Sequence, residues 1–229
     1  MVRVLPVSPF IALCVSRDTG CTTCNTALTF LSSQNHVSTE SHSRKRWNLL
    51  HHLSCKNWLP LFELTNSYDA VYKWFDHLKS NGHYITGYVI LPNHLHVLIG
   101  FKALTQSINT VVSNGKRFIA YEIVKRLEEQ NNAAILKTLS DAVIDSDKKR
   151  GKLHQVFESS FDAKECRREE FINQKLSYMH ENPCKGVWNL AANPSEYLHS
   201  SALFYQTGKH SIYEVINYKE LEDINLTEM

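Results

Sequence analysis

The feature that most constrains the fold is an apolar run, Val89–Ile99, broken only by the dipeptide Pro92-Asn93. Together with the β-branched and aromatic residues before it, this run predicts two strands, or one long bent strand, across residues 83–101. The Pro-Asn pair is a turn signal in the middle of the run. We therefore expect a hairpin that joins the middle strands of a sheet.

Two histidines stand two residues apart in the second half of this run. On a strand, His94 and His96 would point to one face, while Leu95 and Val97 would point to the other face and into a core. Two imidazoles on one face make half of a plausible divalent-metal site. The spacing also fits a pair of histidines on a half-exposed strand, and the pair alone does not separate the two interpretations.

The remaining elements follow from periodicity and stop signals. Val71, Trp74, Phe75 and Leu78 recur at the spacing of an amphipathic helix, which Ser80-Asn81-Gly82 ends. Other segments are assigned in the same way. The predicted order is a strand and turn within 46–62, a helix over 68–79, strands over 83–88 and 89–101, a helix over 105–130, a polar loop over 131–153, a strand over 154–161 and a helix over 164–181.

This order of strands and helices predicts an α+β fold. We expect a small, ferredoxin-like antiparallel sheet with helices packed mainly on one face. The chain has 229 residues, 43% of them hydrophobic, which is enough for one large domain with a core. Residues 1–43 are rich in Ser, Thr, Asn and Cys and are expected to be poorly ordered or atypical. Residues 44–210 form the predicted globular domain, and 211–229 are a C-terminal tail. The segment after the last helix, with Trp188 and Tyr197, is expected to lie over the core.

Charge and hydropathy narrow the class of protein. The net charge is +2 and 21% of residues are charged, so any nucleic-acid-binding surface would have to be local. No run approaches the ~18 apolar residues of a membrane span, and the N-terminus is a poor signal peptide. We expect a protein that is not in a membrane and is cytoplasmic.

The six cysteines have no regular spacing, which favours reduced thiols over a disulfide scaffold. Cys21 and Cys24 form a lone CxxC pair. His36 or His42 could complete a structural zinc site with it. Unconnected thiols explain the same pair.

A second cluster of polar residues comes at the end of the last predicted helix. Tyr178 and Asn182 are four residues apart, so they share one helix face, and Pro183 ends the helix. A tyrosine at such a position is often a packing residue with its hydroxyl at the surface. Beside a metal, however, a phenol is also a competent oxygen nucleophile towards phosphorus.

The two clusters together resemble a known family. Leu91–Ile99, with its Pro-Asn-His-x-His motif, and Tyr178–Gly186, with its Tyr-x-x-x-Asn-Pro motif, resemble the HUH-type single-tyrosine transposases, in particular the REP-associated tyrosine transposases. The segment Tyr197–Ala202 is similar to the part of that branch that follows the Asn-Pro motif. The resemblance covers roughly residues 56–205. It implies that residues 44–210 are a transposase-like catalytic domain.

The resemblance implies a role for each matching residue. His94 and His96 would hold a divalent ion, Mg²⁺ or Mn²⁺, and Asn182 would complete the metal site. Tyr178 would attack a phosphodiester of single-stranded or hairpin DNA, leaving a 5′-phosphotyrosine and a free 3′-hydroxyl. The implied activity is that of an endonuclease and strand transferase in DNA transposition and recombination. Imidazole ligands suit Mn²⁺ better than Mg²⁺.

Several questions remain open at the level of the sequence. Asn48–Leu53 is a weak strand former where relatives begin with a clean β-branched strand, which puts stability and activity in doubt. A non-cleaving hairpin-DNA or RNA-binding module on the same fold, and a metal hydrolase that uses water, are the rival hypotheses. Relatives suggest that a homodimer is possible. The basic residues expected to contact DNA, which could equally be a solvated surface, are Lys116, Arg117, Lys148, Lys149, Arg150 and Lys185.

Overall fold

The computed structural model describes residues 47–101, 107–159, 162–166, 168–186 and 188–223. These residues belong to one compact unit that spans 42–229. The predicted N-terminal segment, 1–43, and the Cys21–Cys24 pair lie outside the described residues.

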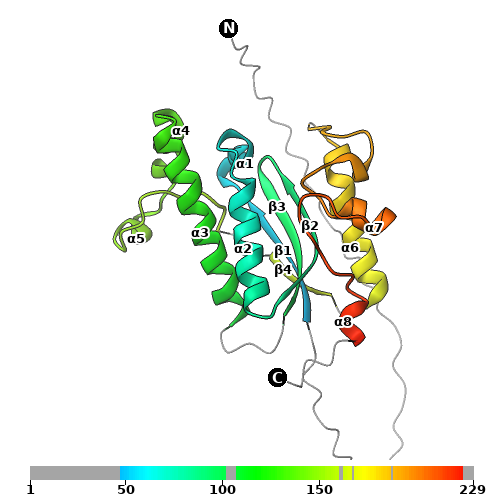
Figure 1. Ribbon diagram of the computed structural model, residues 1–229. Coiled ribbons are helices and arrows are strands. Elements are labelled where there is room, and N and C mark those ends of the chain that lie inside the picture. Colours follow the sequence, from blue (N-terminus) through cyan, green and yellow to red (C-terminus); the bar gives the residue numbers. More distant parts are fainter. Residues whose placement is uncertain (1–46, 102–106, 160–161, 167, 187, 224–229) are drawn as a thin grey trace, which may run out of the picture. The chain divides into compact units, whose positions relative to one another are not determined.

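The described chain alternates strands and helices (Figure 1). The strands are β1 (Trp47–Ser54), β2 (Tyr84–Leu91), β3 (His94–Phe101) and β4 (Asp162–Cys166). The longer helices are α2 (Tyr68–Ser80), α3 (Ile108–Glu129), α4 (Ala133–Asp141) and α6 (Glu169–Glu181). The short helices are α1 (Leu61–Leu64), α5 (Asp145–Lys148), α7 (Ala202–Thr207) and α8 (Glu220–Asp223), with 3₁₀ turns η1 (Lys56–Trp58), η2 (Asn182–Cys184) and η3 (Pro194–Glu196).

The four strands form one sheet in the order β2-β3-β1-β4, and every neighbouring pair is antiparallel. Helix α2 connects β1 to β2, and α3 begins the connection from β3 to β4. This is the split βαβ arrangement of a ferredoxin-like sheet. The predicted α+β fold is confirmed. The first strand, which its residues predicted only weakly, is a central strand paired on both edges.

Helices cover both faces of the sheet, and the larger set, α2, α3 and α4, lies on one face as expected. Helices α2 and α3 pack on the face that carries Leu95 and Val97, while α6 packs on the face that carries Val89 and Leu98. Figure 1 shows α2 and α3 on one side of the sheet and α6 on the other. The physical reason is that strands β2 and β3 are apolar on both faces, and each face must be kept from water.

Three boundaries in the second half of the chain differ from prediction. The fourth strand is Asp162–Cys166, not 154–161, and the earlier segment contributes only an isolated bridge between Phe157 and Cys55. Helix α6 therefore starts at Glu169 rather than at 164. The predicted loop over 131–153 contains two helices, α4 and α5. Asn132 caps α4 through its side chain, which accepts a hydrogen bond from the amide of Ile135 at 3.3 Å.

The C-terminal part of the chain runs along the outer edge of β2. The amide of Ile90 donates to the carbonyl of His199 at 2.9 Å, and the amide of Ile216 donates to the carbonyl of Ile85 at 3.1 Å. Tyr205 adds a side-chain hydrogen bond to the carbonyl of Thr86. These contacts satisfy backbone groups that an edge strand would otherwise expose.

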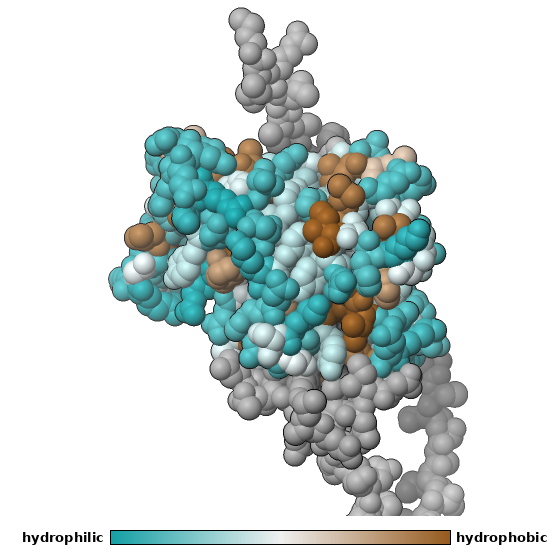
Figure 2. All heavy atoms as spheres, viewed as in Figure 1, coloured by the Kyte–Doolittle hydropathy of each residue, from teal (hydrophilic) through white to brown (hydrophobic). Residues whose placement is uncertain are grey.

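The outer surface of the helices is polar. In Figure 2 hydrophilic residues cover most of the side on which α3, α4 and α5 lie, and hydrophobic side chains gather in patches over the other half of this face. In the described part of the chain, no helix is both long and apolar enough to cross a membrane.

Replacing Gly115 with alanine is expected to destabilise the fold by about 1–3 kcal/mol. A Cβ atom at Gly115 would lie 2.2 Å from the ring of Trp74, which is buried between α2 and α3. This overlap should outweigh the roughly 1 kcal/mol by which alanine favours a helix over glycine. Urea unfolding measures the effect, with the exposed Ser113→Ala in the same helix as the control. Equal stability of Gly115→Ala and the unsubstituted protein would show that Trp74 can move away.

Candidate active site

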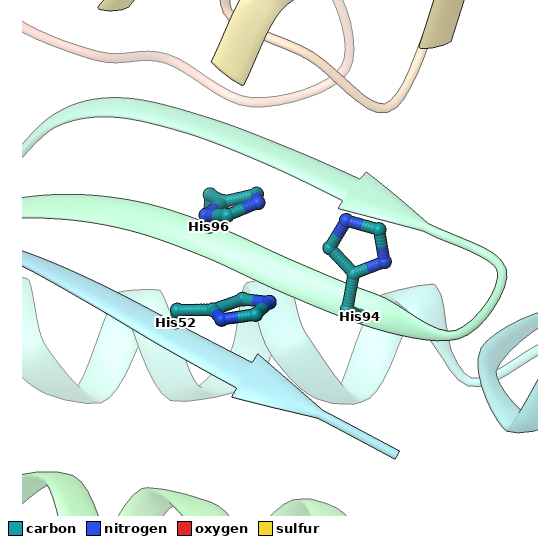
Figure 3. A group of neighbouring side chains, drawn as sticks. All are labelled: His52, His94 and His96. Atoms are coloured by element: carbon teal, nitrogen blue, oxygen red, sulfur yellow. The ribbon is translucent and has the colours of Figure 1, made fainter. Parts of the chain in front are cut away.

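Three histidines from two neighbouring strands converge on one face of the sheet. The register of β1 and β3 places His52 directly opposite His96, and His94 lies two residues before His96 on the same face. The possible ligand atoms of the three side chains all lie within 4.8 Å of one another. Figure 3 shows the three imidazoles together, one from β1 and two from β3.

The rings pack against one another in a fixed arrangement. The imidazoles of His52 and His96 are stacked, with ring centres 4.4 Å apart. The ring of His94 stands nearly perpendicular to both, at 5.4 Å from His52 and 5.1 Å from His96. Three imidazole nitrogens brought this close are a donor set typical of transition-metal sites.

Burial keeps the two β3 histidines in the form that binds metals. Desolvation, and after it the neighbouring His52, lower the pKa of His94 from 6.5 to about 4. The pKa of His96 lies well below its usual value, first because of burial and then because of the charges of His52, His94 and Lys175. Both imidazoles are therefore neutral at pH 7, with a lone pair available for a metal.

One nitrogen of His96 also lacks a hydrogen-bond partner in the described part of the chain. Its Nδ1 atom is buried and, among the described residues, has no hydrogen-bond partner. A buried polar atom without a partner costs about 1–3 kcal/mol. The nitrogen donors, the neutral state of His94 and His96, and this unsatisfied atom all fit a site for a divalent transition metal.

Asn93 fixes the orientation of His94. The side-chain oxygen of Asn93 lies 2.7 Å from Nδ1 of His94, and the side-chain amide of Asn93 donates to the carbonyl of Trp58 at 3.4 Å. With the amide group used in this way, Asn93 presents its oxygen to His94, so Nδ1 of His94 must carry the proton. The lone pair of His94 is then on Nε2. Such contacts to a ligand's second nitrogen orient metal-binding histidines.

Replacing Asn93 with alanine is expected to weaken Mn²⁺ binding by about 10- to 100-fold, because His94 loses the group that holds its ring and tautomer. Asn93→Asp should restore most of the affinity, since a carboxylate also accepts from Nδ1. Calorimetric titration with Mn²⁺ measures both, and the exposed Asn114→Ala is the matched control. Equal loss in the alanine and aspartate variants would contradict the orienting role.

Helix α6 places Tyr178 beside this cluster. The helix is held against the sheet by Ile172, Leu176 and Met179. Burial of such side chains contributes about 1.5–3 kcal/mol each. Tyr178 itself is 61% exposed, and its ring centre lies 6.1 Å from that of His96 in an edge-to-face contact. The phenol of Tyr178 is thus next to the histidines and open to solvent.

A lysine one helical turn before Tyr178 adds positive charge to the site. The ammonium group of Lys175 lies 4.8 Å from the ring centre of Phe171. It is close enough to His96 to disfavour a second positive charge on that imidazole, which is one cause of its lowered pKa. A cation at this position would attract an anionic group brought to the histidines.

The structure brings His94, His96 and Tyr178 together, but it shows no contact between Asn182 and the three histidines among the described residues. Asn182 begins η2, one turn after Tyr178, and is half-buried. His52 lies where a third ligand would be needed, and sequence reasoning missed it. The sequence did contain one indication of this ligand. Asn48–Leu53 has two histidines, His51 and His52, where a strand usually has β-branched residues.

The six basic residues expected to contact DNA occupy two regions. Lys116 and Arg117 lie on α3, whose core is on the opposite face of the sheet from the histidines, and Lys148, Lys149 and Arg150 lie at the end of α5 and just after it. Lys185 lies beyond the end of α6, seven residues after Tyr178, where it pairs with Glu181. Of the six, only Lys185 is on the segment that also carries Tyr178.

Most of these basic side chains already have local partners. Lys116 is half-buried, donates to the carbonyl of Glu158 at 3.1 Å, and has its pKa lowered by burial. Lys148 pairs with Asp145, Arg150 pairs with Asp147, and Arg117 donates to Asn114. Lys149 is exposed. Their role in DNA binding stays a prediction.

Comparisons with known proteins add little to these observations. The sequence matches no protein-family model, and no curated protein matches it. Among solved structures, one similar chain is a REP-associated tyrosine transposase bound to a REP hairpin, with a TM-score of 0.44 and 17% sequence identity. The match covers 74% of this chain and 82% of the other. This is a distant likeness, so the chemistry of the site must be argued from the residues of this chain.

Proposed function

We propose that this protein is a metal-dependent DNA strand transferase in which Tyr178 is the nucleophile. The observation that carries the proposal is the contact of the exposed Tyr178 ring with His96, one of three clustered histidines. The resemblance of the Pro-Asn-His-x-His and Tyr-x-x-x-Asn-Pro motifs to HUH-type transposases supports the same assignment. The proposed substrate is single-stranded DNA that folds into hairpins.

His52, His94 and His96 would hold the divalent cation. When bound, the cation would withdraw charge from the scissile phosphate and orient it for in-line attack. Because all three donors are imidazole nitrogens, we expect Mn²⁺ to bind more tightly than Mg²⁺. In this proposal His52 is the third ligand, the role that the resemblance implied for Asn182.

The chain's own residues perform the transfer. The Tyr178 oxygen attacks phosphorus while the bond from phosphorus to the 3′-oxygen breaks. The phenol loses its proton, and the leaving 3′-oxygen gains one, so the products are a 5′-phosphotyrosine and a 3′-hydroxyl. Lys175 stabilises the charge of the phosphate during attack. A second 3′-hydroxyl can later attack this phosphorus, which forms a new phosphodiester and releases Tyr178 with its phenol proton restored.

A labelled hairpin oligonucleotide with single-stranded flanks tests this proposal. Incubated with the protein and Mn²⁺, it should give a protein–DNA adduct that survives denaturing electrophoresis, and a chelator should prevent it. Retention of the DNA on a native gel without any adduct would instead indicate a non-cleaving DNA-binding module. Cleavage without an adduct would indicate a hydrolase that uses water.

A further inference from the structure

A strained turn next to the histidines exposes a tryptophan. Trp58, in η1, is 58% exposed. Asn57 and Trp58 both have positive φ angles, 52° and 56°. Few non-glycine residues adopt this conformation, because it strains the backbone. Residues strained in this way are concentrated at functional sites. Packing in the core does not explain this tryptophan, because most of its surface is exposed.

The turn is held by contacts on both of its sides. The Glu158 side chain accepts hydrogen bonds from the amide of Asn57 at 2.9 Å and from the ammonium group of Lys56 at 3.0 Å. The amide of Lys56 donates to the carbonyl of Val156 at 2.7 Å. On the other side, the carbonyl of Trp58 accepts from Asn93. The strained backbone is therefore fixed, and the exposed ring has a defined position.

That position is at the edge of the proposed active site. The ring of Trp58 contacts His94 edge-to-face, with ring centres 5.7 Å apart. Asn93 links the two residues, because it hydrogen-bonds both to the backbone of Trp58 and to the ring of His94. A phosphate at the three histidines would therefore lie close to the exposed ring of Trp58, which contacts one of them.

Apart from Tyr178, the proposed nucleophile, the other exposed aromatic residues of the described chain lack this setting. Phe118 and Tyr121 are also exposed, but both lie on α3, whose core is on the opposite face of the sheet.

Every base has a π-face, so stacking on an aromatic side chain binds single strands with little sequence preference. Trp58 combines exposure, rigidity and closeness to the histidines.

We propose that Trp58 is a stacking platform for an unpaired nucleobase adjacent to the scissile phosphate. This inference rests on the proposed function for the identity of the ligand, single-stranded DNA. It adds a binding site for a base that the metal and Tyr178 do not provide. Removing the ring should weaken binding by about 5- to 150-fold, the effect of losing one stacked base.

Binding without chemistry tests the inference. All proteins carry Tyr178→Phe, so that no adduct can form, and are titrated with oligo(dA), oligo(dT) and an abasic strand of equal length. On oligo(dA), Trp58→Ala should bind about 5- to 150-fold more weakly, and Trp58→Phe should recover most of the affinity. On the abasic strand, which has the same phosphates and no bases, Trp58→Ala should bind as well as the protein that keeps Trp58.

Controls separate a stacking role from a structural one. Tyr121→Ala removes an exposed aromatic ring from α3 and should leave all three affinities unchanged. Mn²⁺ titration of Trp58→Ala shows whether the histidine cluster is intact. Equal weakening on the abasic strand, no weakening on oligo(dA), or no binding of any strand by the protein with Trp58 would each overturn the inference. The proposed function is judged separately, by adduct formation in the protein that keeps Tyr178.

Discussion

Substituting phenylalanine for Tyr178 is expected to abolish the covalent protein–DNA adduct, with a loss of rate of at least about 10⁴-fold. Phenylalanine keeps the ring that contacts His96 but lacks the oxygen that would attack phosphorus. Because Tyr178 is 61% exposed, its hydroxyl contributes little to stability, and the variant should fold normally. DNA binding should persist, since the groups that would hold the phosphate are unchanged. The adduct is measured on denaturing gels with a labelled hairpin oligonucleotide.

The matched control for this substitution is Tyr121→Phe. Tyr121 is also exposed, but it lies on α3, which packs on the other face of the sheet from the histidines. The control should form as much adduct as the unsubstituted protein. An adduct that persists in Tyr178→Phe would mean that another residue is the nucleophile.

Replacing His96 with alanine is expected to lower the affinity for Mn²⁺ by more than about 100-fold, because loss of a direct ligand exceeds the effect of losing an outer contact. The same loss is expected for His52→Ala, since His52 faces His96 across the strands. Asn182→Ala should have a much smaller effect. Calorimetry or Mn²⁺ paramagnetic resonance measures the binding, and adduct formation should fall in parallel.

The exposed His77, on α2, supplies a control for removal of any imidazole. His77→Ala should bind Mn²⁺ as tightly as the unsubstituted protein. If Asn182→Ala loses as much affinity as His96→Ala, while His52→Ala retains it, the third ligand is Asn182 and α6 must move on metal binding. If none of these substitutions changes the affinity, the metal binds elsewhere.

Local sequence patterns predicted the parts of the site that lie within a single element. Alternation along one strand places His94 and His96 on the same face, and helical periodicity with a stop at Pro183 places Tyr178 near the end of α6. These are properties of neighbouring residues. They could be derived without knowing which strands pair.

His52 could not be predicted in this way, because its closeness to His96 depends on pairing between strands more than forty residues apart. The alternation in β1 was also blurred, since His51 and His52 stand where β-branched residues are usual. The fourth strand was missed for a related reason. Asp162–Cys166 is short and mostly polar, as an edge strand can be, and its pairing with β1 supplies what its local preference does not.

The layer formed by α6 depends on a second set of apolar side chains on β2 and β3. Val89 and Leu98 belong to the second hydrophobic cluster, with Leu176 and Met179 of α6. This second layer has a functional consequence. It places α6 on the face that carries the histidines, so the same packing that buries Leu176 and Met179 brings Tyr178 to His96.

Mapping the site of the covalent link tests the central claim most directly. The protein is incubated with hairpin DNA and Mn²⁺, the adduct is digested with a protease and a nuclease, and the modified peptide is sequenced by mass spectrometry. We predict a nucleotide attached to Tyr178 through its phenolic oxygen, absent when Mn²⁺ is removed and absent in His96→Ala. A nucleotide attached to any other residue, or a link to Tyr178 that forms equally well without a divalent cation, would contradict the account.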